Sequence, residues 1–112
     1  MRRDRDRLLD IMEAIEKIEK HLSPNIDAFA DDEMRQVWVI HHLQIIGEAA
    51  YGLSQEFRAN HAEIPWAQII GMRHVLVHGY FDIDLDIVWA AIEKDIPPLK
   101  AAVAAVLRQL DI

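Results

Sequence analysis

The sequence contains no cysteine among its 112 residues, so it can form no disulfide and offers no thiolate to a metal ion. It also has no apolar run long enough to cross a membrane. The opening stretch, residues 1–7, mixes bases with acids and is not followed by the apolar segment of a signal peptide. These absences predict a cytoplasmic protein without a membrane anchor.

Positive charge is scarce as well. The chain has 12 lysines and arginines against 19 aspartates and glutamates, for a formal net charge of -7. Binding of nucleic acid is mainly electrostatic, so a chain of this kind that binds RNA must gather its basic groups locally. The same acidity suits a protein that meets a basic partner.

The sequence shows no segment that alternates between apolar and polar residues at period two, so no sheet is expected. Hydrophobic residues make up 52% of the chain, enough for one domain over residues 1–112. Helical periodicity instead predicts an all-α bundle of four to five helices, with a break at Ser23–Asn25, a loop or short turn through Phe29, and a polar connection over residues 54–63. The expected helices are Asp4 to His21, one from Asp31–Glu33 to about Leu53, Trp66 to Val77, one capped by Asp82 or Asp84, and one capped by Asp95.

The second expected helix is apolar almost all round. Its two apolar sides consist of Met34, Trp38, Ile45 and Ala49, and of Val39, Leu43, Ile46 and Ala50. Such a helix is buried on two sides, by its own core and by a second copy of the chain. Between them runs a polar line formed by His41, Gln44 and Glu48. The simpler interpretation is that the histidines make their hydrogen bonds within the bundle.

The third expected helix carries an arginine on its apolar side. On a helical wheel Arg73 falls among Ile69, Ile70 and Leu76. A desolvated charge is costly without a partner, so Arg73 requires a carboxylate, a phosphate or a water-filled cleft. Glu48 is the candidate carboxylate, and from these residues alone an ordinary buried salt bridge is the favoured interpretation of the pair.

Two histidines share another face of that helix. His74 and His78 are four residues apart and lie with Ala67 and Gly71, whose small size suggests a seam between subunits. The pair could share a zinc ion, but no third ligand occurs at a recognisable spacing. On an ideal helix Arg73 and His78 point about 140° apart. Either the helix loosens before Gly79, or two subunits together build the site.

Residues 73–80 have the form Arg-x4-His-x-Tyr, which resembles the signature of HepT-type HEPN-domain ribonuclease toxins. The resemblance extends over about residues 40–100 and includes Ile46-Gly47-Glu48-Ala49-Ala50, Ile64-Pro65-Trp66, Val88-Trp89 and Asp95-Ile96-Pro97. It implies a HEPN-like up-and-down bundle and a homodimer whose two motifs line one cleft. It further implies Arg73 and His78 as the catalytic pair of an endoribonuclease. His74 stands where the family often has asparagine, so its role stays open, as does that of Glu48.

The residue types suit RNA cleavage without a metal or cofactor. A histidine with a pKa near neutrality can take the proton of the 2′-hydroxyl or deliver one to the leaving oxygen. An arginine can hold the phosphate and offset its growing charge. RNA brings its own nucleophile.

Tyr80 has two interpretations. A tyrosine after a helix-ending glycine often only packs its ring. The resemblance instead implies the position at which a partner nucleotidyltransferase antitoxin, of the MNT type, attaches AMP and silences the toxin in a type II toxin–antitoxin pair. A non-catalytic HEPN-like module that binds a nucleotide or a nucleotidyltransferase is the alternative function.

Overall fold

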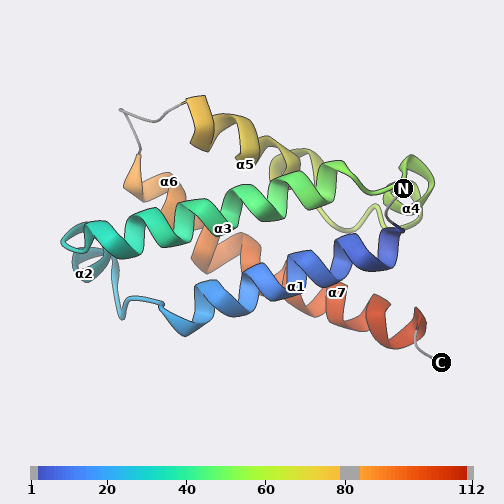
Figure 1. The fold of residues 1–112 in the computed structure, drawn as a ribbon, viewed down its shortest axis with the longest axis horizontal. Coiled ribbons are helices and arrows are strands. Elements are labelled where there is room, and N and C mark those ends of the chain that lie inside the picture. The colour runs from blue at the N-terminus through green and yellow to red at the C-terminus, as the bar shows by residue number, and fades with distance from the viewer. Residues whose placement is uncertain (1–2, 79–83, 111–112) are drawn as a thin grey trace.

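The computed structural model describes residues 3–78 and 84–110, with the backbone alone over 74–78. All regular structure in these ranges is helical, which confirms the predicted all-α class (Figure 1). The long elements are α1 (Asp4–Lys20), α3 (Glu33–Tyr51), α5 (Trp66–His78) and the consecutive α6 (Leu85–Ala90), η1 (Ala91–Asp95) and α7 (Ile96–Leu110). Across the described ranges, no helix combines the length and apolarity that a membrane crossing needs.

The first helix shows how closely local sequence sets an element. Its buried side chains recur at helical spacing: Leu8, Ile11, Ala14, Ile15 and Ile18. Acidic residues occupy its first turn and lysines its last, which complements the helix dipole. The observed end at Lys20 lies one residue before the predicted one.

The two segments expected to connect the long helices, the first as a loop or short turn and the second as a polar connection, each contain a short helix, α2 (Ile26–Ala30) and α4 (Gln55–Asn60). Each is started by a side-chain cap: Asn25 accepts a hydrogen bond from the Ala28 N–H, and Ser54 accepts one from the Phe57 N–H. Helices of five and six residues are too short to display a periodic apolar face, which is why the pattern missed them.

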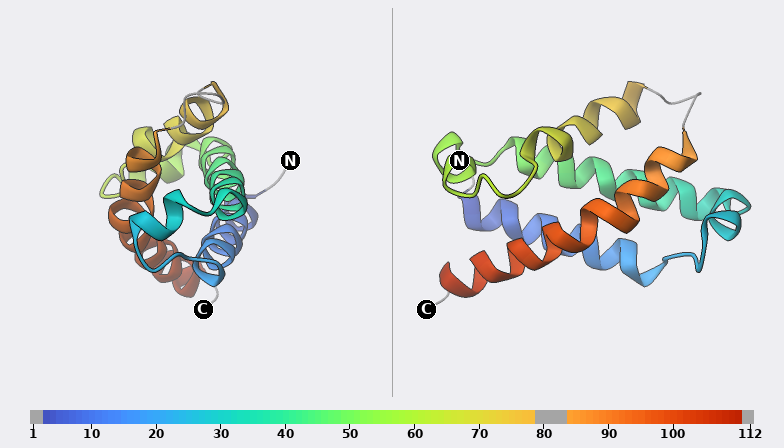
Figure 2. Two further views of the ribbon diagram at one scale, coloured as in Figure 1. Left: turned by 90° about the vertical axis from the view of Figure 1, so that its left-hand side faces the viewer. Right: turned by 180° about the vertical axis from the view of Figure 1, so that it is seen from behind.

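The prediction of two separate C-terminal helices, the second capped by Asp95, is wrong. The chain continues from α6 through η1 into α7 as one rod, seen crossing the bundle in the right-hand view of Figure 2. The Ile96 N–H donates to the carbonyl of Ala91, five residues back, so Asp95 lies inside a π-helical turn. Pro97 and Pro98 follow at once and have no N–H to donate. The wider turn carries the helix through the point where prolines would otherwise break it.

Helix α3 lies between α1 and α5, and the C-terminal rod covers the other side of the bundle (Figures 1 and 2). The largest fully buried side chains come from every layer: Phe29, Leu8, Ile11, Ile15, Ile18, Leu43, Ile46, Ile69, Leu99, Val39, Val88 and Val103. One predicted apolar side of α3 is in this core. On the other side Ala49 is buried, while Met34 is 84% exposed and Trp38 is also exposed.

Candidate functional site

Arg73 is held by the last turns of α3. Its side chain is 18% exposed, and its Nη1 donates a hydrogen bond to Glu48 Oε1 at 3.0 Å. The guanidinium carbon also lies 3.7 Å from the centre of the Tyr51 ring. The ion pair with Glu48 expected from the sequence is therefore present, and a cation–π contact accompanies it.

Gly47 brings the two helices together at this point. A Cβ atom on Gly47 would lie 2.9 Å from the backbone nitrogen of Arg73 and 3.1 Å from the carbonyl oxygen of Ile69. Helix α5 thus rests directly on the backbone of α3, one residue before Glu48. Sequence reasoning missed this role; the available signal was a glycine inside a helix, where it costs about 1 kcal/mol relative to alanine.

The hydrogen-bond donors of Arg73 that are not used within the chain decide what the site can bind. Arginine has five N–H donors. Nη1 reaches Glu48, whereas Nε is buried and has no hydrogen-bond partner in the described part of the chain. The Glu48 side chain is 64% exposed. Exposed ion pairs contribute only about 0.2–1 kcal/mol, so an incoming phosphate can replace Glu48 at small cost.

The remaining predicted residues fall where side chains are not described. Helix α5 runs unbroken to His78, in agreement with the predicted end before Gly79. The side chains of His74 and His78 lie outside the described part, and Tyr80 lies outside the described residues altogether. Their predicted roles stay predictions.

Comparison with known proteins places the chain in a family. A model of the family described as "Ribonuclease HepT-like" matches residues 11–106. The chain belongs to the HepT-like ribonuclease family.

Named relatives agree with this. The HepT-like chain is 41% identical over 100 residues to a protein of Thermococcus cleftensis named "Probable ribonuclease HepT", covering 88% of this chain and 91% of that protein. A protein of Caldanaerobacter subterraneus subsp. tengcongensis, whose name gives RNase as a proposed activity, is 37% identical over 92 residues, or 82% of each chain. One from Methanocaldococcus jannaschii, whose name combines gamma-glutamylcyclotransferase with a proposed RNase, is 38% identical over 102 residues. The match covers 90% of this chain and 46% of that longer protein. No solved structure matches the chain.

A hollow of about 280 Å³ lies beside Glu48 in this HepT-like chain, between α1 and α3. The polar line of α3 predicted from the sequence lines it, together with two residues of α1; the lining residues are Arg7, Asp10, His41, Gln44, Ile45, Glu48 and Ala49. The Arg7 guanidinium continues past the hollow and lies against Gly52. A second arginine therefore stands close to the end of α3 that holds Arg73.

Among the histidines whose side chains are described, the buried one is His42, the residue after His41 of the predicted line. It is 4% exposed, and its Nδ1 lies 2.8 Å from the carbonyl oxygen of Trp38. His41, by contrast, is exposed. The interpretation of the predicted line as histidines satisfied within the bundle is therefore wrong for His41, and the buried, hydrogen-bonded histidine is its neighbour His42.

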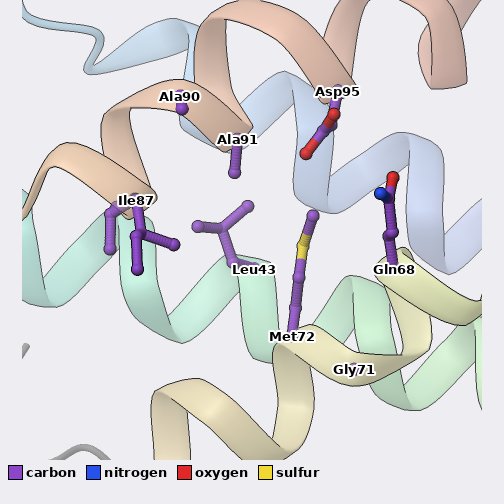
Figure 3. A pocket seen from close by; sticks show the side chains of 9 residues that line it. Leu43, Gln68, Gly71, Met72, Ile87, Ala90, Ala91 and Asp95 are labelled. Atoms are coloured by element: carbon purple, nitrogen blue, oxygen red, sulfur yellow. The ribbon is translucent and has the colours of Figure 1, made fainter. Parts of the chain in front are cut away.

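Another side of α5 carries a second, larger concavity (Figure 3). This groove of about 460 Å³ lies between α5 and the α6–η1 segment, and its lining residues are Leu43, Gln68, Gly71, Met72, Ile87, Val88, Ala90, Ala91 and Asp95. Its walls are mainly apolar, with Asp95 and Gln68 near one end (Figure 3). Arg73, the predicted catalytic residue whose side chain is described, does not line it.

Proposed function

We propose that this chain is a metal-independent endoribonuclease and the toxin of a type II toxin–antitoxin pair. The observation that carries the proposal is Arg73: an arginine held by the backbone, a carboxylate and a ring of α3, whose Nε has no hydrogen-bond partner in the described part of the chain. Buried charges in proteins are normally fully paired. A guanidinium with a buried, unpartnered Nε and an easily exchanged carboxylate suits an anion that arrives later.

Arg73 would bind the phosphate at the bond to be cut. Cleavage requires attack of the 2′-oxygen on phosphorus, departure of the 5′-oxygen and movement of one proton at each. The extra negative charge that builds up on the phosphate oxygens is stabilised by the guanidinium. His78 takes the proton of the 2′-hydroxyl, and a protonated imidazole supplies the proton to the leaving oxygen. The products are a 2′,3′-cyclic phosphate and a free 5′-hydroxyl.

A homodimer would supply both histidines to one cleft. Helix α5 is unbroken between Arg73 and His78, which supports assembly from two chains over local loosening of the helix. The outer face of α3 adds support, because Met34, Val37 and Trp38 are all exposed there. Sedimentation of the free protein at micromolar concentration tests this, and a clean monomer would contradict a shared site.

The test of the activity is RNA cleavage by the purified chain in excess chelator. We expect cleavage to continue in EDTA and to leave 2′,3′-cyclic or 3′-phosphate ends, identified by their mass. Loss of cleavage in EDTA, restored by a divalent metal, would contradict the mechanism.

Silencing by AMP transfer to Tyr80 rests on the position of this residue in the motif. An attached AMP would bring a phosphodiester charge that competes with RNA for Arg73 and a nucleoside that fills the cleft. Co-expression with a partner nucleotidyltransferase should add one or more AMP units to the wild type and none to Tyr80→Phe, as measured by intact mass. Modification of another residue would remove Tyr80 from the mechanism.

A non-catalytic module that binds a nucleotide or nucleotidyltransferase is the second candidate. The formal net charge of -7 favours it, because RNA is repelled by an acidic chain. The same assay separates the two functions: the module would bind its partner and leave every RNA intact.

A further inference from the structure

Tyr51 is a large aromatic side chain that the fold leaves at the surface beside Arg73. It is the last residue of α3 and is 54% exposed, although the guanidinium already covers one face of its ring. The accessible surface of this residue therefore lies away from the face that the guanidinium covers. Tyrosines usually bury the ring and hydrogen-bond the hydroxyl, and Tyr51 has no hydrogen bond in the described part of the chain.

Support for Arg73 explains only part of this arrangement. The cation–π contact needs one face of the ring, and Glu48 and Gly47 already fix the arginine from the preceding turn. A smaller or aliphatic residue would cover the stem of Arg73 with less exposed apolar surface. What an aromatic ring adds at this place is a second flat face, open to solvent, at one contact distance from the phosphate-binding group.

Single-stranded RNA presents the chemistry that fits such a face. Its unstacked bases are held in proteins on aromatic rings and on arginine planes, whatever their sequence. Phosphates and bases alternate along the strand, so a phosphate bound at the edge of the Arg73 guanidinium brings a neighbouring base close to Tyr51.

We propose that Tyr51 is a stacking platform for an RNA base that flanks the phosphate bound by Arg73. This inference rests on the proposed ribonuclease function and adds a preference to it. The site takes RNA whose bases are unstacked, such as a loop or single strand, and discriminates little among the four bases.

A double-mutant cycle tests the platform. The cleaved bond of a single-stranded oligonucleotide is first located with the wild-type chain. Binding is then measured in the His78→Ala background, so that the RNA stays whole, with the intact oligonucleotide and with one carrying an abasic ribose on either side of that bond. The protein variants are Tyr51→Leu, Tyr51→Phe and Leu22→Ala, a change at another exposed apolar side chain, located between α1 and α2.

The abasic change should weaken binding by roughly five- to 150-fold, the value of one base–aromatic stack. Tyr51→Leu should lose a similar factor on the intact RNA and lose nothing more on the abasic one. Tyr51→Phe, which keeps the ring, should still respond to the abasic change, as should Leu22→Ala. If the abasic change costs Tyr51→Leu as much as it costs the parent, or if Tyr51→Leu binds intact RNA normally, the platform is overturned.

The salt dependence of RNA binding shows whether Tyr51→Leu loses a stacked base or displaces Arg73. Loss of one phosphate contact on a single strand lowers the salt slope by about 0.7. Arg73→Ala should show this change and keep the abasic penalty, whereas Tyr51→Leu should keep the parental slope. A slope reduced in Tyr51→Leu would assign the residue to positioning Arg73 alone. If the wild-type chain neither binds nor cuts RNA, the ribonuclease proposal itself fails; if it cuts RNA without coupling between Tyr51 and the base, only the platform fails.

Discussion

The two faces of α5 are packed in opposite ways. On the α3 side, Gly47 lets the helices touch through their backbones, and a Cβ atom there would collide with Arg73. On the other side, Gly71 opens into a groove, and a Cβ atom there would meet nothing within 4 Å. One glycine thus makes a close helix–helix contact at Arg73, and another, Gly71, lies in open space on the same helix as this arginine.

This difference indicates where positional accuracy is needed. A side chain that must meet a phosphate has to be held to a fraction of an ångström, since small displacements of a catalytic group cost large factors in rate. Arg73 stands on the side where backbone, carboxylate and ring all hold it. The groove side supplies apolar cover from residues such as Met72 and Val88 without comparable constraint.

The largest contrast between the two faces should come from truncating one side chain on each. Arg73→Ala removes the group that we propose stabilises the developing charge, and we expect cleavage to fall at least about 100- to 1000-fold with helical content unchanged. Gln68→Ala, an exposed change at the groove, should cleave at the wild-type rate. Initial rates and far-ultraviolet circular dichroism measure both, and an active Arg73→Ala would remove this arginine from the chemistry.

The sequence predicts which side chains need a partner better than it predicts how closely two helices approach. The pairing of Arg73 with Glu48 follows because a charge on an apolar face requires a partner, and two helical patterns supply only a few candidates. Gly47 and Tyr51 escape the same reasoning because periodicity assigns a residue to a face and does not say how closely two helices approach. The π-helical turn before Pro97 is missed for a related reason: two prolines look like a helix start, and only the preceding backbone decides whether the helix restarts or widens.

The next contrast compares Gly47 with Gly71, and it concerns both activity and stability. Gly47→Ala places a methyl group against backbone atoms of α5, which have no freedom to move aside, so the helices must separate. We expect a loss of about 1–3 kcal/mol in the free energy of unfolding. The shift of Arg73 should lower cleavage by about 10- to 100-fold in the folded fraction. Denaturant unfolding and rates per folded molecule give the two numbers; a stable and fully active Gly47→Ala would mean that the contact at α3 is not what positions the arginine.

A smaller contrast comes from neutralising one carboxylate on each side. Glu48→Gln removes the charge that competes with phosphate for Arg73, and the value of an exposed ion pair corresponds to a rise of about 1.5- to fivefold in RNA affinity in the His78→Ala background. Asp95→Asn makes the same change in net charge on the groove side and should leave affinity nearly unchanged. Equal gains in both variants would attribute the effect to overall charge and remove Glu48 from the site.

The smallest effect is expected for Gly71→Ala, which should raise the stability of the protein instead of lowering it. Glycine inside a helix loses more conformational entropy on folding than alanine, and a methyl group at this position enters empty space. The variant should therefore gain about 0.5–1 kcal/mol in the free energy of unfolding and keep wild-type cleavage. Thermal unfolding followed over a range of protein concentrations is the measurement, because the small residues Ala67 and Gly71 were also expected to form a seam between subunits. A methyl group on a seam would press against the second copy, so the variant would lose stability at concentrations where the wild type is a dimer, and dilution to monomers would reduce the loss. A gain that is independent of concentration leaves Gly71 facing an open groove and directs the search for the dimer contact to the exposed face of α3.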